Sequence, residues 1–249
     1  MALAGMIRSV GIGLAALAVT GCATVRSPDP RDPWESYNRA MFEFNDAVDR
    51  GVFKPVAKGY RFITPKAVDR SVTNFFANLD EIPTAANNAL QGKFTKSAQD
   101  VTRFVYNTTF GVAGLFDVAS HMGLPKNEED FGQTLGVWGV EPGPYFVMPI
   151  LGPSTVRDTS GRLVDFWVKP SRQIEDNNTR YAMYALELTD TRADLLDVEE
   201  LVSEVAFDRY VAFRNAYLER REFLVYDGRP PQSEQDDLLK ELEMLESQP

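Results

Sequence analysis

Hydrophobic residues recur at intervals of three and four along most of the chain, which is the spacing of one face of an α-helix. Asp32, Pro33 and Glu35 form a helix start, and Gly51 and Pro55 are expected to end the same helix. Between them the apolar stripe consists of Tyr37, Met41, Phe44, Val48 and Val52. The pattern therefore predicts one amphipathic helix near the beginning of the folded part.

Similar stripes predict helices along the rest of the chain, separated by proline and glycine. The expected boundaries, in chain order, are a start at Thr64-Pro65, a stop near Pro83, a left-handed cap at Gly92, a start at Thr95, a cap at Ser154 or Thr155, a stop at Pro170, further starts at Thr179, at about Val198 and before Tyr210, and a break from Asp227 to Pro231. No convincing strand-like alternation is present. The predicted fold class is mostly α.

The stretch 131–161, FGQTLGVWGVEPGPYFVMPILGPSTVRDTSG, does not fit this pattern. Its 22 residues from Gly132 to Pro153 hold five glycines, four prolines and a single charge, Glu141. The prolines exclude a continuous helix, and the apolar content is too high for a solvent loop. Two placements stay open: a core loop clamped by helices, or an irregular segment against lipid or a pore, where protein or water must satisfy its backbone.

The first 25 residues indicate export. Arg8 precedes an apolar run, 10–19, that has signal-peptide length and is too short to span a bilayer. The following residues, Val19-Thr20-Gly21-Cys22, resemble the bacterial lipobox. This resemblance implies that Cys22 becomes the first mature residue and carries diacylglycerol plus an amide-linked acyl chain such as palmitate. The alternative is an ordinary signal peptide with a chance cysteine. Ala23, where an aspartate would retain the protein, implies delivery to the inner leaflet of the outer membrane.

Charge and the leader divide the chain into four parts. The formal net charge is −10, and it becomes −11 once the leader, with Arg8 as its one charge, is removed. This sign argues against nucleic acid as a partner and against docking on anionic lipid through a basic patch. We expect a lipoprotein signal peptide at 1–21, a polar tether at 22–33, a helical domain at 34–228 and an acidic tail at 229–249.

Residues that would support catalysis are scarce. The single histidine, His121, has no Gly-x-Ser-x-Gly nucleophile elbow elsewhere in the chain to act with. The single cysteine is assigned to the lipid, so no Cys/His zinc cluster is available, and no phosphate-binding or dinucleotide-binding glycine motif is present. The many carboxylates offer pairs, but nothing marks one. We expect no enzyme activity, no cofactor and no metal.

Five stretches together resemble one family, the MlaA (VacJ) outer-membrane lipoproteins of intermembrane phospholipid transport. They are DPWESYNRAMFEFN (32–45), NFFANLDEIPTAANNALQGK (74–93), RFVYNTTFGVAGLFDVA (103–119), DFGQTLGVWGVEPGPYFVMPILGPSTVRD (130–158) and RNAYLERREFLVYDG (214–228). The likeness runs in order through nearly the whole mature chain, which makes it specific, and the lipobox agrees with it independently.

The resemblance implies a ring-like single domain of broken amphipathic helices that lie in one membrane leaflet around a polar channel. It implies a trimeric porin as neighbour. Phospholipids misplaced in the outer leaflet would enter the channel and pass to a soluble periplasmic lipid carrier, which keeps the outer membrane's lipid asymmetry. Two alternatives stay open, namely a structural envelope scaffold without lipid passage and a lipid-hydrolysing enzyme.

The matched motifs also imply site residues. The family places the first helix at the channel, and Asn38 and Asn45 are expected to face the polar passage beside Arg39. Phe44 is expected to face lipid or to pack in the interior. The alternative for these residues is a solvated helix face. The residues expected to set the shape of the irregular segment are Gly143, Pro144, Pro149, Gly152 and Pro153. Arg157 and Asp158 would hold that segment by pairing, or lie on the surface.

The acidic tail is expected to bind the soluble carrier. From Ser233 onward it has a narrow leucine stripe at Leu238, Leu242 and Leu245 among acidic residues. A tethered amphipathic segment of this kind suits binding as a helix in a groove.

Overall fold

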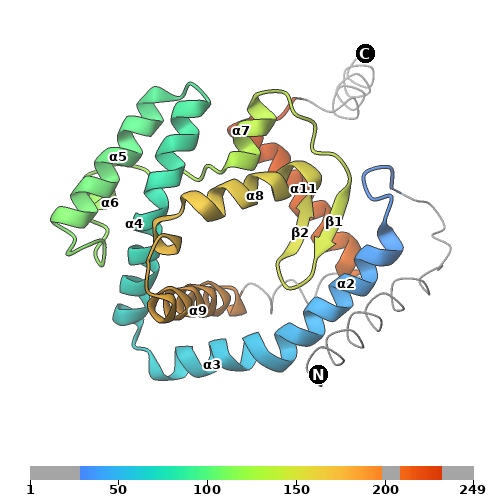
Figure 1. Cartoon of the computed structure of the whole chain (residues 1–249), viewed down its shortest axis with the longest axis horizontal. Coiled ribbons are helices and arrows are strands. Elements are labelled where there is room, and N and C mark those ends of the chain that lie inside the picture. Colours follow the sequence, from blue (N-terminus) through green and yellow to red (C-terminus); the bar gives the residue numbers. More distant parts are fainter. Residues whose placement is uncertain (1–28, 198–207, 232–249) are drawn as a thin grey trace, which may run out of the picture.

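A computed structural model describes residues 29–197 and 208–231 of the chain, and its elements follow one another around a ring (Figure 1). The lipidation residue Cys22, the helix expected from about Val198 and the tail from Ser233 lie outside the described residues. Within them, no helix combines the length and the apolar character that crossing a bilayer requires.

The described part is mostly helical, as predicted. Its elements are α2 (Glu35–Val48), the π-helical turn η1 (Asp49–Phe53), α3 (Lys54–Ile63), α4 (Lys66–Leu90), α5 (Phe94–Thr109), α6 (Val118–His121), α7 (Phe131–Val137), β1 (Tyr145–Met148), β2 (Gly152–Thr155), α8 (Val156–Val168), the 3₁₀ turn η2 (Pro170–Arg172), α9 (Asn177–Asp194) and α11 (Arg209–Val225).

The first helix does not end where glycine and proline predicted. Through Gly51 and Pro55 the chain continues from α2 into α3, with η1 as a wide turn between them. Pro55 falls in the first turn of α3, where its missing N–H is tolerated. A π-type turn changes the hydrogen-bond register at the junction, so the two helices form one bent arc rather than two separate elements.

The stop predicted at Pro83 is also wrong, because α4 runs through it to Leu90. A proline inside a helix costs about 3 kcal/mol, so the turns beyond it must be held by packing. Their buried side chains are Thr84, Ala85, Asn87 and Asn88, and α4 packs along α5 in the antiparallel pair at the left of Figure 1. Tertiary packing therefore outweighs the local signal.

Local signals place other boundaries well. Gly92 has φ +78°, as a left-handed cap requires, and the side chain of Thr155 accepts a hydrogen bond from the Asp158 backbone at the start of α8. In contrast, α5 begins at Phe94 after Lys93, which provides no side-chain cap, so the start predicted at Thr95 is wrong.

The segment predicted to be irregular contains a helix and a β-hairpin. Its first residues form α7, and β1 pairs antiparallel with β2 in the register Tyr145 to Thr155 and Met148 to Gly152. The expectation of no strands is therefore wrong. Each strand has only four residues, which is too few for an alternation to stand out among glycine and proline.

Burial in this fold is inverted relative to a water-soluble domain. Among the described residues, nine apolar side chains are buried, whereas twenty buried ones are polar or charged. The compact apolar cluster consists of Tyr145, Val147 and Tyr210, with partly buried side chains of α2 and α11 around it. Large apolar side chains face outward instead, and Phe62 and Trp167 are 91% and 71% exposed. Exposed apolar surface on this scale is normally covered by lipid or by a partner.

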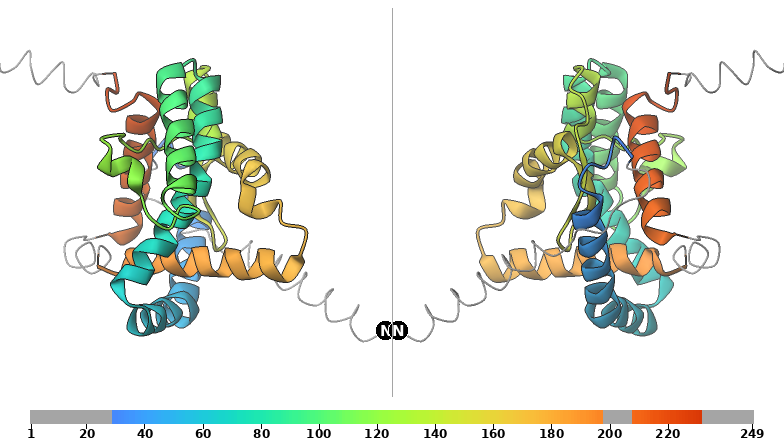
Figure 2. Two further views of the ribbon diagram at one scale, coloured as in Figure 1. Left: turned by 90° about the vertical axis from the view of Figure 1, so that its left-hand side faces the viewer. Right: turned by 90° about the vertical axis from the view of Figure 1, so that its right-hand side faces the viewer.

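The ring is not flat. In the side views, α8 and α11 lie on opposite faces of the molecule, with the α4–α5 pair between them (Figure 2). The hairpin contacts both α2 and α11, so the elements that carry the two ends of the described chain meet at it.

Candidate functional site

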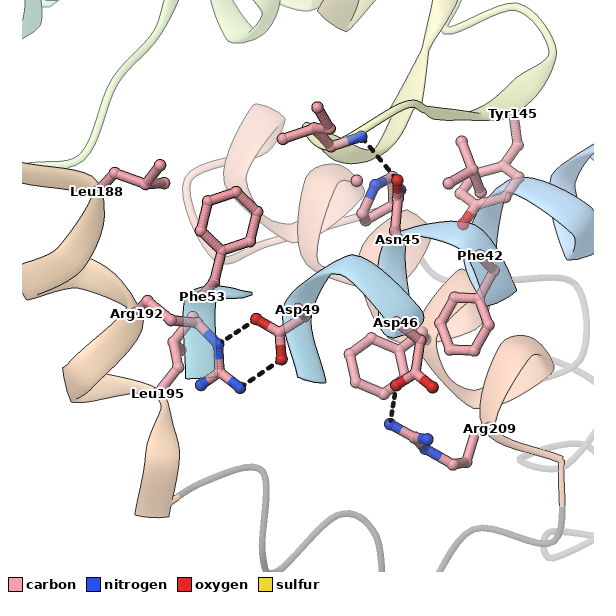
Figure 3. A pocket seen from close by; sticks show the side chains of 15 residues that line it. Phe42, Asn45, Asp46, Asp49, Phe53, Tyr145, Leu188, Arg192, Leu195 and Arg209 are labelled. Atoms are coloured by element: carbon pink, nitrogen blue, oxygen red, sulfur yellow. Dashed lines mark hydrogen bonds and ion pairs between the residues drawn. The ribbon is translucent and has the colours of Figure 1, made fainter. Parts of the chain in front are cut away.

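A cavity of about 370 Å³ lies between α2 with η1, the hairpin, α9 and α11 (Figure 3). We call it the central cavity. Its size is within the range of about 300–1,000 Å³ that is usual for ligand sites. Most of its lining is apolar; the large apolar side chains are Phe42, Phe53, Tyr145, Val147, Ile150, Leu188, Leu195 and Phe213.

Two ion pairs interrupt this apolar lining. Arg192 of α9 donates to both carboxylate oxygens of Asp49, at 2.6 and 2.7 Å. Arg209 of α11 lies 3.3 Å from Asp46, which also pairs with the exposed Arg50 outside the cavity at 2.9 Å. The four lining charges balance. One pair joins the start of η1 to α9, and the other joins the last turn of α2 to α11.

Asn45 lines the central cavity and holds the turn of the hairpin. Its Nδ2 donates to the Met148 carbonyl at 2.9 Å, and its Oδ1 accepts from the Ile150 amide at 2.6 Å. Ile150 has φ +67°, a left-handed conformation that β-branched residues rarely adopt. One side chain thus fixes a strained turn at the wall of the cavity.

Asn38 lies elsewhere than expected. It has no exposed surface and is not part of the cavity lining. Its Nδ2 donates to Asp32 at 2.7 Å and to the Tyr145 carbonyl at 3.2 Å, and its Oδ1 accepts from the Val147 amide at 2.8 Å. Asn38 therefore binds the edge of β1 instead of facing an open passage.

The other two residues predicted in the first helix lie at its surface. Arg39 pairs with Glu35 at 2.8 Å and with Asp208 at 2.9 Å. Its hydrogen bond lowers the pKa of the Asp208 carboxyl below its ordinary value, against a smaller effect of burial. Phe44 is 46% exposed, so it points away from the packed interior.

Residues 29–33 are part of the fold rather than of a free tether. Asp32, expected as a helix cap, is 1% exposed and accepts hydrogen bonds from Tyr210 and from Arg214, the latter at 3.0 Å. The Arg31 carbonyl accepts from the Tyr145 amide at 2.8 Å. Trp34 takes the cap position without a side-chain bond, and the Asp32 carboxylate instead joins α2, through Asn38, to α11.

The five residues expected to set the shape of the segment lie before and within the hairpin. Gly143 and Gly152 have φ +66° and +77°, values that other residues adopt only with strain. Pro144 directly precedes β1, Pro149 is in the turn, and Pro153 lies opposite Val147 in the ladder.

Arg157 and Asp158 pair at 3.0 Å in the interior, not on the surface. Asp158 also accepts from Arg221 at 3.0 Å and from Tyr217 at 2.8 Å. Arg221 further bonds Asp130, at 2.5 and 3.0 Å. Burial alone would raise the pKa of the Asp158 carboxyl, but Arg221 and Arg157 lower it overall. This buried network joins α7, α8 and α11 behind the hairpin.

His121 is the last residue of α6 and is exposed, with its Nδ1 2.8 Å from the Asp117 carbonyl. Within residues 29–197 and 208–231, no group of histidine, cysteine or carboxylate side chains is arranged to hold a metal ion. The polar groups that line the central cavity are guanidinium, carboxylate and amide groups among apolar walls, and such groups can bind a ligand noncovalently.

Four charged residues of the central cavity were missed by the sequence analysis. Asp46 and Asp49 were visible on the polar face of the first helix, but nothing marked them above its other polar residues. Arg192 and Arg209 come from distant helices, and no spacing in the sequence connects them to those carboxylates. Only the fold brings the four together.

Comparisons with known proteins agree on one family. The sequence model of the family described as MlaA lipoprotein matches residues 30–224. The chain is 35% identical over 241 residues to the intermembrane phospholipid transport system lipoprotein MlaA of Haemophilus influenzae, covering 92% of this chain and 96% of that protein. It is 33% identical to the protein of the same description in Escherichia coli K12, covering 89% and 90%.

A solved structure from work on the structural basis for maintenance of bacterial outer membrane lipid asymmetry has the same fold. It superposes with a TM-score of 0.69 at 33% identity and covers 78% of this chain and 98% of its own.

Proposed function

The chain belongs to the MlaA lipoprotein family, and on that premise we propose that it removes misplaced phospholipids from the outer leaflet of the outer membrane. The lipids pass through a polar channel in the ring and are handed to a soluble periplasmic carrier, in the direction of the inner membrane. The relatives named as intermembrane phospholipid transport lipoproteins support this proposal, since their match covers most of both chains.

The observation that carries the proposal is the inverted burial. Among the described residues, most buried side chains are polar or charged, and many large apolar side chains are exposed. In water this arrangement would expose a large apolar surface, whereas in a bilayer leaflet it matches the surroundings. We therefore propose that the ring lies in a single leaflet, the inner one, where its exposed apolar side chains meet hydrocarbon.

The central cavity forms part of the proposed lipid path. A charged headgroup that crosses hydrocarbon without help faces a large desolvation cost. Asn45 and the pairs Asp46–Arg209 and Asp49–Arg192 offer polar partners inside a ring whose outside is apolar. A lipid that slides along them keeps its headgroup solvated by protein while its chains stay in contact with apolar surface.

Attachment and partners complete the proposal. Acyl chains on Cys22 anchor the chain, and a multi-chain anchor holds far more firmly than a single one. A trimeric porin covers part of the exposed apolar surface, and the soluble carrier accepts the lipid on the periplasmic side. Transport of this kind breaks no covalent bond, so the chain acts as a transport component and not as an enzyme.

Deleting the gene tests the function. We expect more phospholipid in the outer leaflet, measured with an amine-reactive reagent that does not cross the membrane, and full restoration by the wild-type gene. If the protein were only a structural scaffold, deleting its gene would still weaken the envelope. The purified protein, however, would not speed the movement of labelled phospholipid from vesicles to a soluble acceptor. Absence of any such transfer would favour the scaffold.

The anchor is tested separately. The variant Cys22→Ser should stay an uncleaved or soluble precursor and fail to restore the outer leaflet. If that variant fractionates with the outer membrane like the wild type, the lipid-anchor part of the proposal is wrong.

A further inference from the structure

The lining of the central cavity is divided between apolar and charged groups. Tyr145 and Val147, each 1% exposed, are deeply buried parts of the lining, and Leu188 of α9 and Phe53 of η1 add further apolar surface (Figure 3). The charged groups lie on α2, η1, α9 and α11 and are partly accessible, with side-chain exposures between 14% and 38%. Ligand sites are typically built in this way, from apolar walls and a few placed polar groups.

The two ion pairs differ in tightness. Arg192 and Asp49 are joined by two short bonds of 2.6 and 2.7 Å, whereas the single contact between Arg209 and Asp46 is 3.3 Å long. The Asp46–Arg209 pair is therefore the one that a ligand can open more easily.

Arg209 also has an unused donor. Its Nε is buried and has no hydrogen-bond acceptor among the described residues, although leaving a buried donor unsatisfied destabilises a protein. The guanidinium lies 5.9 Å from the centre of the Phe42 ring, which holds the group beside the cavity. A phosphate oxygen is the acceptor that a guanidinium fork binds best.

We infer that the central cavity binds a zwitterionic phospholipid, whose phosphate takes Arg209, whose ammonium takes Asp46, and whose hydrocarbon chain lies along the apolar walls. This inference rests on the proposed function and names its substrate class. The phosphate takes the place of the Asp46 carboxylate beside Arg209, and the ammonium takes the place of the Arg209 guanidinium beside Asp46. Each protein charge therefore keeps a partner of opposite sign.

Selection against anionic lipid follows from the same geometry. A headgroup that carries phosphate without an amine would open the Arg209 pair and leave the Asp46 carboxylate without its partner on α11. Asp49 lies one helical turn further along and adds a second negative charge, held by Arg192. Asp46 keeps its pair with the exposed Arg50 at 2.9 Å, but its carboxylate then lies beside a bound anion, and the repulsion between the two disfavours that lipid.

Lipid capture from mixed vesicles tests the inference. Full-length protein is incubated with vesicles of equal parts phosphatidylethanolamine and phosphatidylglycerol, reisolated, and its bound lipid measured by mass spectrometry. We expect the wild type to enrich phosphatidylethanolamine. Asp46→Asn removes the ammonium partner and should shift the bound ratio toward phosphatidylglycerol by roughly tenfold, the effect of one charge-assisted hydrogen bond.

A matched control separates local from global charge. Glu128→Gln makes the same change in net charge at an exposed position that pairs with the exposed Arg220, and it should keep the wild-type ratio. Arg209→Lys provides a second test, since it keeps the charge but removes the planar fork. It should reduce the amount of phosphatidylethanolamine retained.

The outcomes distinguish a failure of the headgroup inference from a failure of the proposed function. If the wild type binds both lipids in the vesicle ratio, or if Asp46→Asn and Glu128→Gln give equal ratios, the headgroup inference is overturned and the proposed function is unaffected. If wild-type protein that is folded captures no phospholipid at all, the proposed function itself fails.

Discussion

The backbones of Gly132 in α7 and Gly161 in α8 are in direct contact: a Cβ atom added to Gly161 would lie 2.2 Å from the Gly132 nitrogen. No side chain fits in this space, and the neighbour is backbone that cannot rotate away. The contact holds α7 against α8 beside the buried Arg221–Asp130–Asp158 network. It is thus the point at which the segment 131–161 folds back on itself.

Replacing Gly161 by alanine should destabilise the protein strongly. We expect Gly161→Ala to lower the free energy of unfolding by about 2–3 kcal/mol, because overpacking must separate the two helices. Urea unfolding in detergent micelles measures the change. Gly59→Ala in α3 is the control, since its Cβ would meet nothing within 4 Å; it should stabilise by about 0.5–1 kcal/mol. Equal effects of the two substitutions would contradict this assignment.

The turn of the hairpin depends on Asn45. Asn45→Leu removes both hydrogen bonds to the strained turn and leaves the Met148 carbonyl and the Ile150 amide without their partner, at a cost of about 1–3 kcal/mol. We expect raised outer-leaflet phospholipid and greater detergent sensitivity in cells. Glu43→Gln, on the exposed side of the same helix, should behave as wild type. A normal phenotype for Asn45→Leu at normal protein level would count against this role.

Local chemistry predicted the helix boundaries that depend on a few neighbouring residues. The cap at Gly92, the cap at Thr155 and the stop at Pro170 are all of this kind. The errors at Pro55 and Pro83 have a common cause: each proline breaks a helix in isolation, but a π-type turn or packing against another helix restores continuity. The residues next to each proline do not reveal the contacts that keep the helix continuous.

The site was predictable only in part. The motif resemblance led to Asn45, which lines the cavity, and also to Asn38, which is buried against β1. Helical periodicity places these two residues on the same face and cannot show that one meets a strand and the other a cavity. The pairing of Asp49 with Arg192, 143 positions later, is set entirely by how α9 closes the ring.

Asp190 makes stability depend on pH. It is buried between Tyr60 and Thr73, whose hydroxyls donate to it at 3.0 Å each. Burial raises the pKa of its carboxyl, and Asp194 and Asp69 add to this effect beyond what the hydroxyls offset. The folded pKa is above the unfolded one, so this contribution to stability is present below the ordinary value near 3.8 and is lost as pH rises through the folded pKa.

It follows that Asp190→Asn should raise the Tm at pH 7, because the amide removes a poorly solvated charge and can still bond both hydroxyls. The difference from wild type should shrink as the pH falls, because the raised pKa lets the wild-type carboxyl take up its proton at a higher pH than an ordinary aspartate. Melting curves at several pH values, with Glu128→Gln as the exposed control, measure it. A lower Tm at pH 7 for Asp190→Asn would contradict the assignment.

The tryptophans report whether the ring lies in lipid. All three, Trp34, Trp138 and Trp167, are exposed, at 48%, 54% and 71%. In vesicles, brominated acyl chains should quench their fluorescence and aqueous iodide should not, with the largest contribution from Trp167. Single Trp→Phe variants assign the signal to each position. Quenching by iodide alone would show that these side chains face water.

The central claim is that phospholipid passes through the central cavity, and blocking that cavity tests it most directly. Leu188 lines the cavity, while Leu186 on the same helix is 40% exposed. In cells whose own copy is deleted, outer-leaflet phospholipid should stay as high with Leu188→Trp as with no gene, and return to the wild-type level with Leu186→Trp. Full restoration by Leu188→Trp, at normal protein level, would contradict the account.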